Sequence, residues 1–173
     1  MIENERKWQE REPFATLAII DSRSIKNADT AKLKGYDAAK KVSGIKLHLA
    51  VDILGLPLAM HVTTADKSDK AGAGEMLACN FSTLLGIKKV IVDGGYSGAY
   101  FADFVKTIYA ADVEVVKRNE LHKFAVLPKR WIVERSFGWL DKNRRLWKNC
   151  ERKLHNSKQF TVLAFISILL KRF

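Results

Sequence analysis

The feature that most constrains the fold is an alternation over positions 45–52, within the segment 44–55, of one face that is wholly apolar and one that is mostly polar. One face of this segment carries Ile45, Leu47, Leu49 and Val51, and the other carries Lys46, His48, Ala50 and Asp52. A period of two residues is typical of a β-strand. Gly55 separates this run from a second apolar run at residues 56–66, so the two segments predict a β-hairpin.

Shorter apolar runs predict three more strands, at residues 16–21, 88–93 and 111–117, and helical patterns occupy residues 68–86, 97–110, 128–147 and 157–171. The resulting order predicts an α/β fold with a mixed five-stranded sheet and helices on its faces. Right-handed crossovers can place the first strand beside the fourth. Asp21 and Asp93, which end these two strands, would then emerge at one edge of the sheet.

Glu134 is a third acidic residue of interest, because it is the only acid between Glu120 and Asp141 and stands among the cations of the 128–147 helix. By itself it is typical of an ion-pair partner, whereas together with the two aspartates it could complete a cluster. Three adjacent carboxylates repel one another unless a cation neutralises them. Carboxylate oxygens suit Mg²⁺ or Mn²⁺, and two such ions about 3.5–4 Å apart can support phosphoryl transfer.

The charge of the chain favours a polyanionic partner. The net charge is +11, from 30 lysines and arginines against 19 acidic residues, and the pI is near 9.7. Residues 129–173 hold twelve of the cations and three of the acids. DNA or RNA is therefore the expected partner, contacting mainly the last quarter of the chain. A basic surface without a dedicated partner is the alternative.

Four blocks, "IIDSRSIK", "GIKLHLAVDILGLPLAMHVTTAD", "VIVDGGYSG" and "KRWIVERSFGWLDKNRRL", resemble bacterial insertion-sequence transposases of the compact DDE group. The resemblance implies a ribonuclease-H-like fold, with Asp21, Asp93 and Glu134 as catalytic and metal-binding residues and Mg²⁺ or Mn²⁺, in two ions, as cofactor. It also implies cleavage at transposon ends, strand transfer into target DNA, and a homodimer or higher assembly on both ends. Two positions depart from the family pattern: Leu127 replaces a tyrosine and Asp141 a lysine.

The resemblance divides the chain into a lead-in or linker at residues 1–16 and a catalytic domain at residues 17–173. Relatives usually carry a helical region before the first aspartate, whereas only 20 residues precede Asp21. Two interpretations follow: the chain works with an upstream reading-frame product, or it is a truncated, inactive remnant that binds DNA. A structure-selective nuclease that cuts without joining is a further alternative.

Several other residues receive a predicted role. Contacts to DNA are expected from Arg130, Arg135, Lys142, Arg144, Arg145 and Tyr96, with a solvated basic face as the alternative for the cations. Most of Trp131, Trp139 and Trp147 are expected in the core, with base stacking as the alternative. Structural hydrogen bonds are expected for His48 and Asp52, and turn or cap roles for Asp66 and Asp69.

The remaining features concern the compartment. Cys79 and Cys150 form no metal-binding motif and are expected to be buried thiols of a reducing compartment. The start of the chain is charged, and its most apolar run has 11 residues, from Phe160 to Leu170, which is too short to span a bilayer. A cytoplasmic, nucleoid-associated protein is therefore expected.

Overall fold

The computed structural model describes residues 1–116 and 129–171. Its strands are β1 (Leu17–Lys26), β2 (Gly35–Asp37), β3 (Val42–Val51), β4 (Pro57–Thr64), β5 (Lys89–Asp93) and β6 (Asp112–Val116). Its α-helices are α1 (Ile2–Trp8), α2 (Asp69–Cys79), α3 (Ala99–Tyr109), α4 (Arg130–Asp141) and α5 (Leu154–Leu170). Short 3-10 turns are η1 (Phe81–Leu84), η2 (Gly94–Tyr96) and η3 (Arg144–Leu146).

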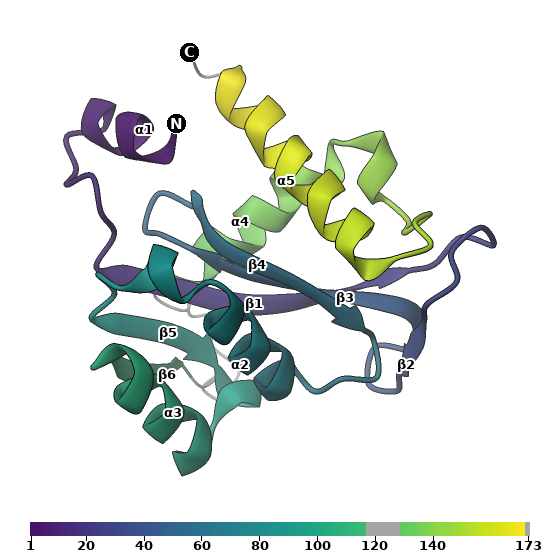
Figure 1. Ribbon diagram of the computed structural model, residues 1–173, viewed down its shortest axis with the longest axis horizontal. Helices are drawn as coiled ribbons and strands as arrows, with labels where there is room; N and C mark the ends of the chain where they lie inside the picture. Colours follow the sequence, from purple (N-terminus) through teal and green to yellow (C-terminus); the bar gives the residue numbers. More distant parts are fainter. Residues whose placement is uncertain (117–128, 172–173) are drawn as a thin grey trace, which may run out of the picture.

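The described strands form one mixed sheet in the order β2-β3-β1-β5-β6, with β4 paired to β3 (Figure 1). The strands β1, β3 and β4 are antiparallel, and β5 lies parallel to both β1 and β6. The predicted hairpin and the pairing of the first strand with the strand at 88–93 are thus confirmed.

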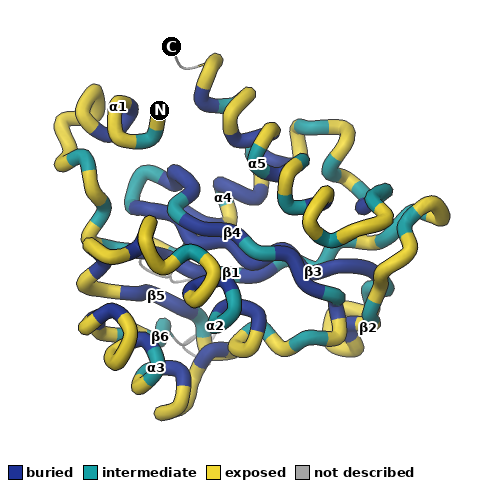
Figure 2. The backbone as a smooth tube through the Cα atoms, in the orientation of Figure 1, coloured by how far each residue is buried: buried dark blue, intermediate teal, exposed yellow. Residues whose placement is uncertain are grey.

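Helices cover both faces of this sheet, and each face has its own core. On one face, Ala73 and Met76 of α2 and Val105 of α3 pack against the sheet. On the other face, Val133 and Phe137 of α4 pack against it together with α5. Figure 2 shows the central strands as the most deeply buried part of the chain. The predicted three-layer α/β arrangement is therefore confirmed.

Three features differ from the sequence-based expectation. The sheet has six strands among the described residues rather than five, because residues 35–37 pair with the start of β3 although their polar surroundings predicted a loop. β1 continues to Lys26 instead of ending at Asp21, since β3 pairs with it along its whole second half. Residues 2–8 of the lead-in form the helix α1.

The two cysteines are free, as expected, but they are not buried. Cys79 is exposed at the end of α2, and Cys150 is half-buried. Their neighbours in the sequence predicted burial, but Cys79 is the last residue of α2 and Cys150 lies in the connection between η3 and α5. Across residues 1–116 and 129–171, the structure contains no helix with the length and apolar character needed to cross a membrane.

Candidate active site

Asp21 lies in the middle of β1, just beyond the point where β1 and β5 separate. The parallel pairing of these strands ends with Ile19 opposite Ile91. Two residues further along each strand come Asp21 and Asp93, so the register places them at the same level on neighbouring strands. The carboxylate of Asp21 accepts a hydrogen bond from the backbone N–H of Ser22 at 2.7 Å.

Asp93 is the last residue of β5 and begins the turn η2. Its Oδ1 accepts a hydrogen bond from the backbone N–H of Gly95 at 2.9 Å, which caps the turn and fixes the carboxylate. A Cβ at Gly95 would lie 3.0 Å from that same Oδ1. A side chain at this position would therefore crowd the carboxylate, which accounts for the glycine found there.

Glu134 is far from the two aspartates in the sequence and lies in the second turn of α4. This helix lies against β1 and β3 through Ile132, Val133 and Phe137. Glu134 itself lies on the exposed side of α4, with 57 % of its side chain accessible. The helix thus presents a carboxylate on a longer side chain beside the two aspartates of the strands.

Arg130 joins the three acids. Its Nη2 lies 3.4 Å from Asp93 Oδ2 and 4.0 Å from Asp21 Oδ2, and its Nε lies 3.5 Å from Glu134 Oε1. One guanidinium therefore reaches a carboxylate from β1, one from β5 and one from α4. The fold therefore places the three predicted acids within reach of one cation, which the sequence analysis did not anticipate. Their catalytic and metal-binding roles stay a prediction.

The electrostatics of this cluster are dominated by Asp21. The pKa of Asp21 is raised from 3.8 to about 6, mainly by burial and in smaller part by the negative charge of Asp93. The hydrogen bond from Ser22 and the positive charge of Arg130 lower that pKa without cancelling the effect of burial. The site therefore holds a carboxylate whose ionised form is only partly compensated.

The donor set fits a divalent cation in chemistry, although not in the present arrangement. Among the described residues, no three acidic, histidine or cysteine side chains are grouped closely enough to hold one ion. The three carboxylates nevertheless offer the oxygen ligands that Mg²⁺ and Mn²⁺ prefer. The ionised Asp21 also lacks a full counter-charge. Residues that could hold such ions are thus Asp21, Asp93 and Glu134.

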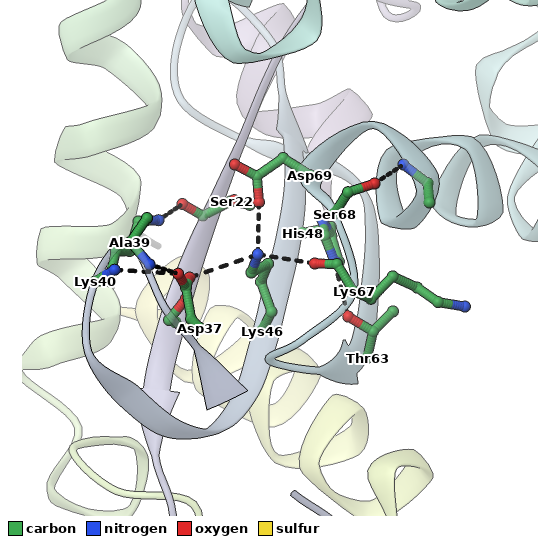
Figure 3. A network of polar contacts seen from close by, with 12 residues as sticks. Ser22, Asp37, Ala39, Lys40, Lys46, His48, Thr63, Lys67, Ser68 and Asp69 are labelled. Atoms are coloured by element: carbon green, nitrogen blue, oxygen red, sulfur yellow. Dashed lines mark hydrogen bonds and ion pairs between the residues drawn. The ribbon is translucent and has the colours of Figure 1, made fainter. Parts of the chain in front are cut away.

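A buried polar network lies next to Asp21, centred on Lys46 of β3 (Figure 3). The ammonium of Lys46 contacts Asp69 Oδ1 at 2.9 Å and Asp37 Oδ2 at 3.5 Å, and donates to the carbonyl of Lys67 at 2.8 Å. Asp69 also accepts a hydrogen bond from Ser22 Oγ at 2.7 Å. Burial acts to raise the pKa of Asp69, but the hydrogen bonds from Lys46 and Ser22 outweigh it and lower the pKa.

Sequence reasoning missed this network. The alternation in residues 44–55 placed Lys46 on a polar face, but only the packing of α2 shows that this face is covered. Asp69, expected as a cap, is the first residue of α2, whereas Ser68 caps the helix through Ala71 N–H. Asp66 lies in the expected turn.

The expected structural role of His48 is confirmed. Its Nε2 contacts Thr63 Oγ1 at 3.0 Å in the interior, and burial lowers the pKa of the imidazole to about 4. Asp52 is also structural: it is fully buried, pairs with Arg6 of α1, and accepts hydrogen bonds from the backbone of the turn between β3 and β4.

Tyr96 does not fit its predicted role as a DNA contact. Its side chain is 1 % exposed and packs at 5.7 Å, centre to centre, from the ring of Phe101. Burial raises its pKa well above the usual value, and the charges of Asp21 and Asp69 add to the effect. The turn after Asp93 points the ring inward, because the apolar surface of α3 covers it.

The tryptophans divide differently from the expectation that most are in the core. Trp139 packs against the core on the α4 side, whereas Trp131 and Trp147 are 46 % and 69 % exposed. Arg135, predicted to contact phosphate, has its guanidinium 4.7 Å from the ring centre of Trp131 and 5.1 Å from that of Trp139. It also donates to the carbonyl of Leu54 at 2.9 Å, so part of its capacity is used within the fold.

The other predicted DNA contacts lie at the far end of α4 and after it. Lys142 and Arg144 are exposed. Arg145 is exposed as well, but it pairs with Glu151 at 2.6 Å and lies over the ring of Phe160. Asp141, which replaces a lysine of the family pattern, pairs with Arg23 of β1 at 2.6 Å. Leu127, the other departure, lies outside the described residues.

Comparison with known proteins identifies the family of this chain. The family model described as the transposase DDE domain matches residues 12–170. This chain belongs to the transposase DDE-domain family. It is 29 % identical over 132 residues to a Brucella ovis protein that bears the name of a transposase for insertion sequence element IS6501. That alignment covers 73 % of this chain and 98 % of the relative.

Solved structures show the same fold as this DDE-domain chain. A chain of the simian T-cell lymphotropic virus intasome, solved with PP2A regulatory subunit B56 gamma, superposes with a TM-score of 0.54 at 15 % identity. A chain of the Mos1 mariner paired end complex with Mn superposes with a TM-score of 0.51 at 13 % identity. The matches cover 88 % and 96 % of this chain, which spans about half the length of each solved chain (48 % and 53 %). The ribonuclease-H-like fold is thereby confirmed.

Proposed function

We propose that this transposase DDE-domain chain cleaves DNA strands at transposon ends and transfers them into target DNA, using Mg²⁺ or Mn²⁺. The observation that supports this most is the gathering of Asp21, Asp93 and Glu134 around one guanidinium, from three separate elements. A structural ion-pair network has no need for three acids of which one is buried with a raised pKa.

Each part of the chain has a distinct task in this proposal. Two divalent ions, when bound, supply an activated water and stabilise the leaving oxygen of the phosphodiester. Asp21 and Asp93 offer ligands from a rigid sheet, and Glu134 offers one from an exposed side of α4 that DNA can approach. Lys142, Arg144 and Arg145 hold the phosphate backbone, positioning the scissile bond without reading sequence.

The proposed partners are transposon ends and target DNA. The Mos1 structure is described as a paired end complex with Mn, which supports DNA ends and a divalent metal for this fold. We extend this to a homodimer or higher assembly acting on two ends, with an upstream reading-frame product as a further possible component. The nucleoid is the proposed location, since a basic chain is attracted to DNA of any sequence.

The test is cleavage and joining of labelled duplexes that carry the ends of the encoding element, with Mg²⁺ or Mn²⁺. Asp93→Asn and Glu134→Gln should each lower both reactions by roughly two orders of magnitude or more, since a metal ligand contributes several kcal/mol to transition-state stabilisation. DNA binding in the absence of metal should persist. Asp112→Asn is the control, because this exposed aspartate pairs with Lys106 on the β6 side, away from the cluster.

Three results would contradict the proposal. Full activity of Asp93→Asn would remove the site assignment. A wild-type chain without metal-dependent cleavage or joining, even when fused to an upstream frame, would establish the inactive DNA-binding remnant instead. Cleavage of branched substrates without any joining would establish a nuclease on the same fold.

A further inference from the structure

The position of Arg130 is unusual for a DNA-binding side chain. It is the first residue of α4, and its guanidinium points into the acid cluster, with 21 % of the side chain exposed. The three carboxylates that it reaches come from β1, β5 and α4, at 3.4 to 4.0 Å. As it stands, Arg130 neutralises the acids rather than offering its charge to a phosphate.

Arg130 is held there by charge rather than by a fixed hydrogen-bond geometry. The distances to the three acids exceed those of good charge-assisted hydrogen bonds, which are about 2.7–2.9 Å. Its Nε is enclosed yet has no hydrogen-bond partner within the described residues. A side chain in this state can leave its position at little cost once another cation serves the carboxylates.

A divalent ion and the guanidinium compete for the same place. Each needs the free oxygens of Asp93 and Glu134, and each is positive. Two like charges about 4 Å apart repel each other strongly even at an effective dielectric constant of about 20, and a divalent ion doubles this repulsion. The three acids carry three negative charges against the single positive charge of Arg130. The cluster therefore keeps a net negative charge that attracts further cations.

We propose that Arg130 is an exchangeable counter-ion: it fills the acid cluster when metal is absent and turns outward when metal ions are bound. The displaced guanidinium then faces the side from which DNA approaches, where a phosphate can pair with it. This step rests on the function proposed above. Because such coupling is reciprocal, DNA that draws Arg130 outward raises the affinity for metal, and metal raises the affinity for DNA.

Calorimetric titration with Mn²⁺ in the absence of DNA tests the exchange. Arg130→Gln should bind Mn²⁺ about tenfold more tightly than the wild type, because the competing charge is gone. Arg130→Lys, which keeps the charge, should stay near the wild-type affinity. Arg23→Gln is the matched control, since it removes an arginine from another carboxylate, Asp141, outside the cluster.

The outcomes separate this inference from the proposed function. If Asp93→Asn abolishes Mn²⁺ binding while Arg130→Gln leaves its affinity unchanged or weakens it, the metal site stands and the exchange is wrong. If neither wild type nor Arg130→Gln binds Mn²⁺, both are wrong. If Arg130→Gln fails to fold, the wild type alone decides: an arbitrary-sequence duplex should tighten Mn²⁺ binding several-fold, and no change would overturn the coupling.

Discussion

Asp21 illustrates at the scale of one residue how an active site can oppose stability. Because its pKa in the folded protein, about 6, exceeds the ordinary value of 3.8, the ionised carboxylate is more favourable in the unfolded chain. The destabilisation starts as the pH rises past about 4 and is complete above about 6. A buried acid without a full counter-charge therefore lowers the stability of the fold, and its presence is explained by its function.

Asp21→Asn should accordingly stabilise the metal-free protein. We expect a gain of up to about 3 kcal/mol at pH 8, shrinking to about half of that at pH 5, where the wild-type carboxyl is largely protonated. Urea unfolding in the presence of a chelator measures it. Asp112→Asn, which loses a surface ion pair, should show no gain at either pH. A gain for Asp21→Asn that does not depend on pH would contradict the electrostatic explanation.

Local patterns in the sequence single out the three acids, because Asp21 and Asp93 each follow an apolar run and Glu134 stands among cations. Their catalytic role stays a prediction. The sequence could not predict what surrounds them. The contact of Arg130 with Asp93 requires α4 to cross the sheet at one angle. The burial of Tyr96 requires α3 to cover the turn after β5. Both depend on tertiary packing, which local sequence patterns do not indicate.

At the scale of elements, α2 is positioned by a close approach to β3. A Cβ added to Gly72 would lie 2.1 Å from Nε2 of His48, whereas Gly74, two residues along, has no neighbour within 4 Å of an added Cβ. The first glycine is needed for packing and the second is not. The helix N-terminus that carries Asp69 toward Lys46 and Ser22 depends on this approach.

Alanine substitutions at these two glycines should therefore differ in sign. Gly72→Ala should destabilise the protein by about 1–3 kcal/mol, since His48 is fully buried and cannot retreat. Gly74→Ala should stabilise it by about 0.5–1 kcal/mol, as expected for a glycine replaced within a helix. Denaturant unfolding measures both. Equal effects of the two variants would show that α2 does not pack on β3 as described.

The hydrophobic patterns predicted most of the strands and helices, and failed where hydrophobicity is weak. Residues 22–26 are mostly polar, yet they extend β1, because β3 supplies a complete ladder of partners from Ser22 to Lys26. Residues 35–37 form β2 for the same reason, against the first residues of β3. Strand formation there is decided by an available edge rather than by side-chain pattern.

At the scale of the whole molecule, the two cores on opposite faces of the sheet leave one place where strands and helix meet at the surface. The strands β1 and β5 diverge beyond Ile19 and Ile91, and α4 passes beside the opening with Arg130 and Glu134. The excess of cations in the last quarter of the chain, already visible in the sequence, lies on one side of this place. Cations after α4 continue from the acid cluster along η3 toward α5.

The salt dependence of DNA binding tests whether DNA lies along these cations. Each phosphate contact adds close to one unit to the slope of log affinity against log salt, because neutralising a phosphate releases a counter-ion. Lys142 and Arg144 are exposed and form no ion pair within the described residues, so they are available for such contacts. Replacing both with alanine should therefore reduce the slope by about two units.

Arg11→Ala is the matched control for these two substitutions. Arg11 is also an exposed cation, but it follows α1, which lies at the left of Figure 1, whereas the chain between α4 and α5 lies at the right. Fluorescence anisotropy of a labelled duplex over a range of salt concentrations gives the slopes. If DNA lies along the line from Glu134 past η3, only the Lys142 and Arg144 substitutions change the slope. A similar loss from Arg11→Ala would mean that the overall field, and not this surface, binds the phosphates, because a diffuse field is indifferent to which cation is removed.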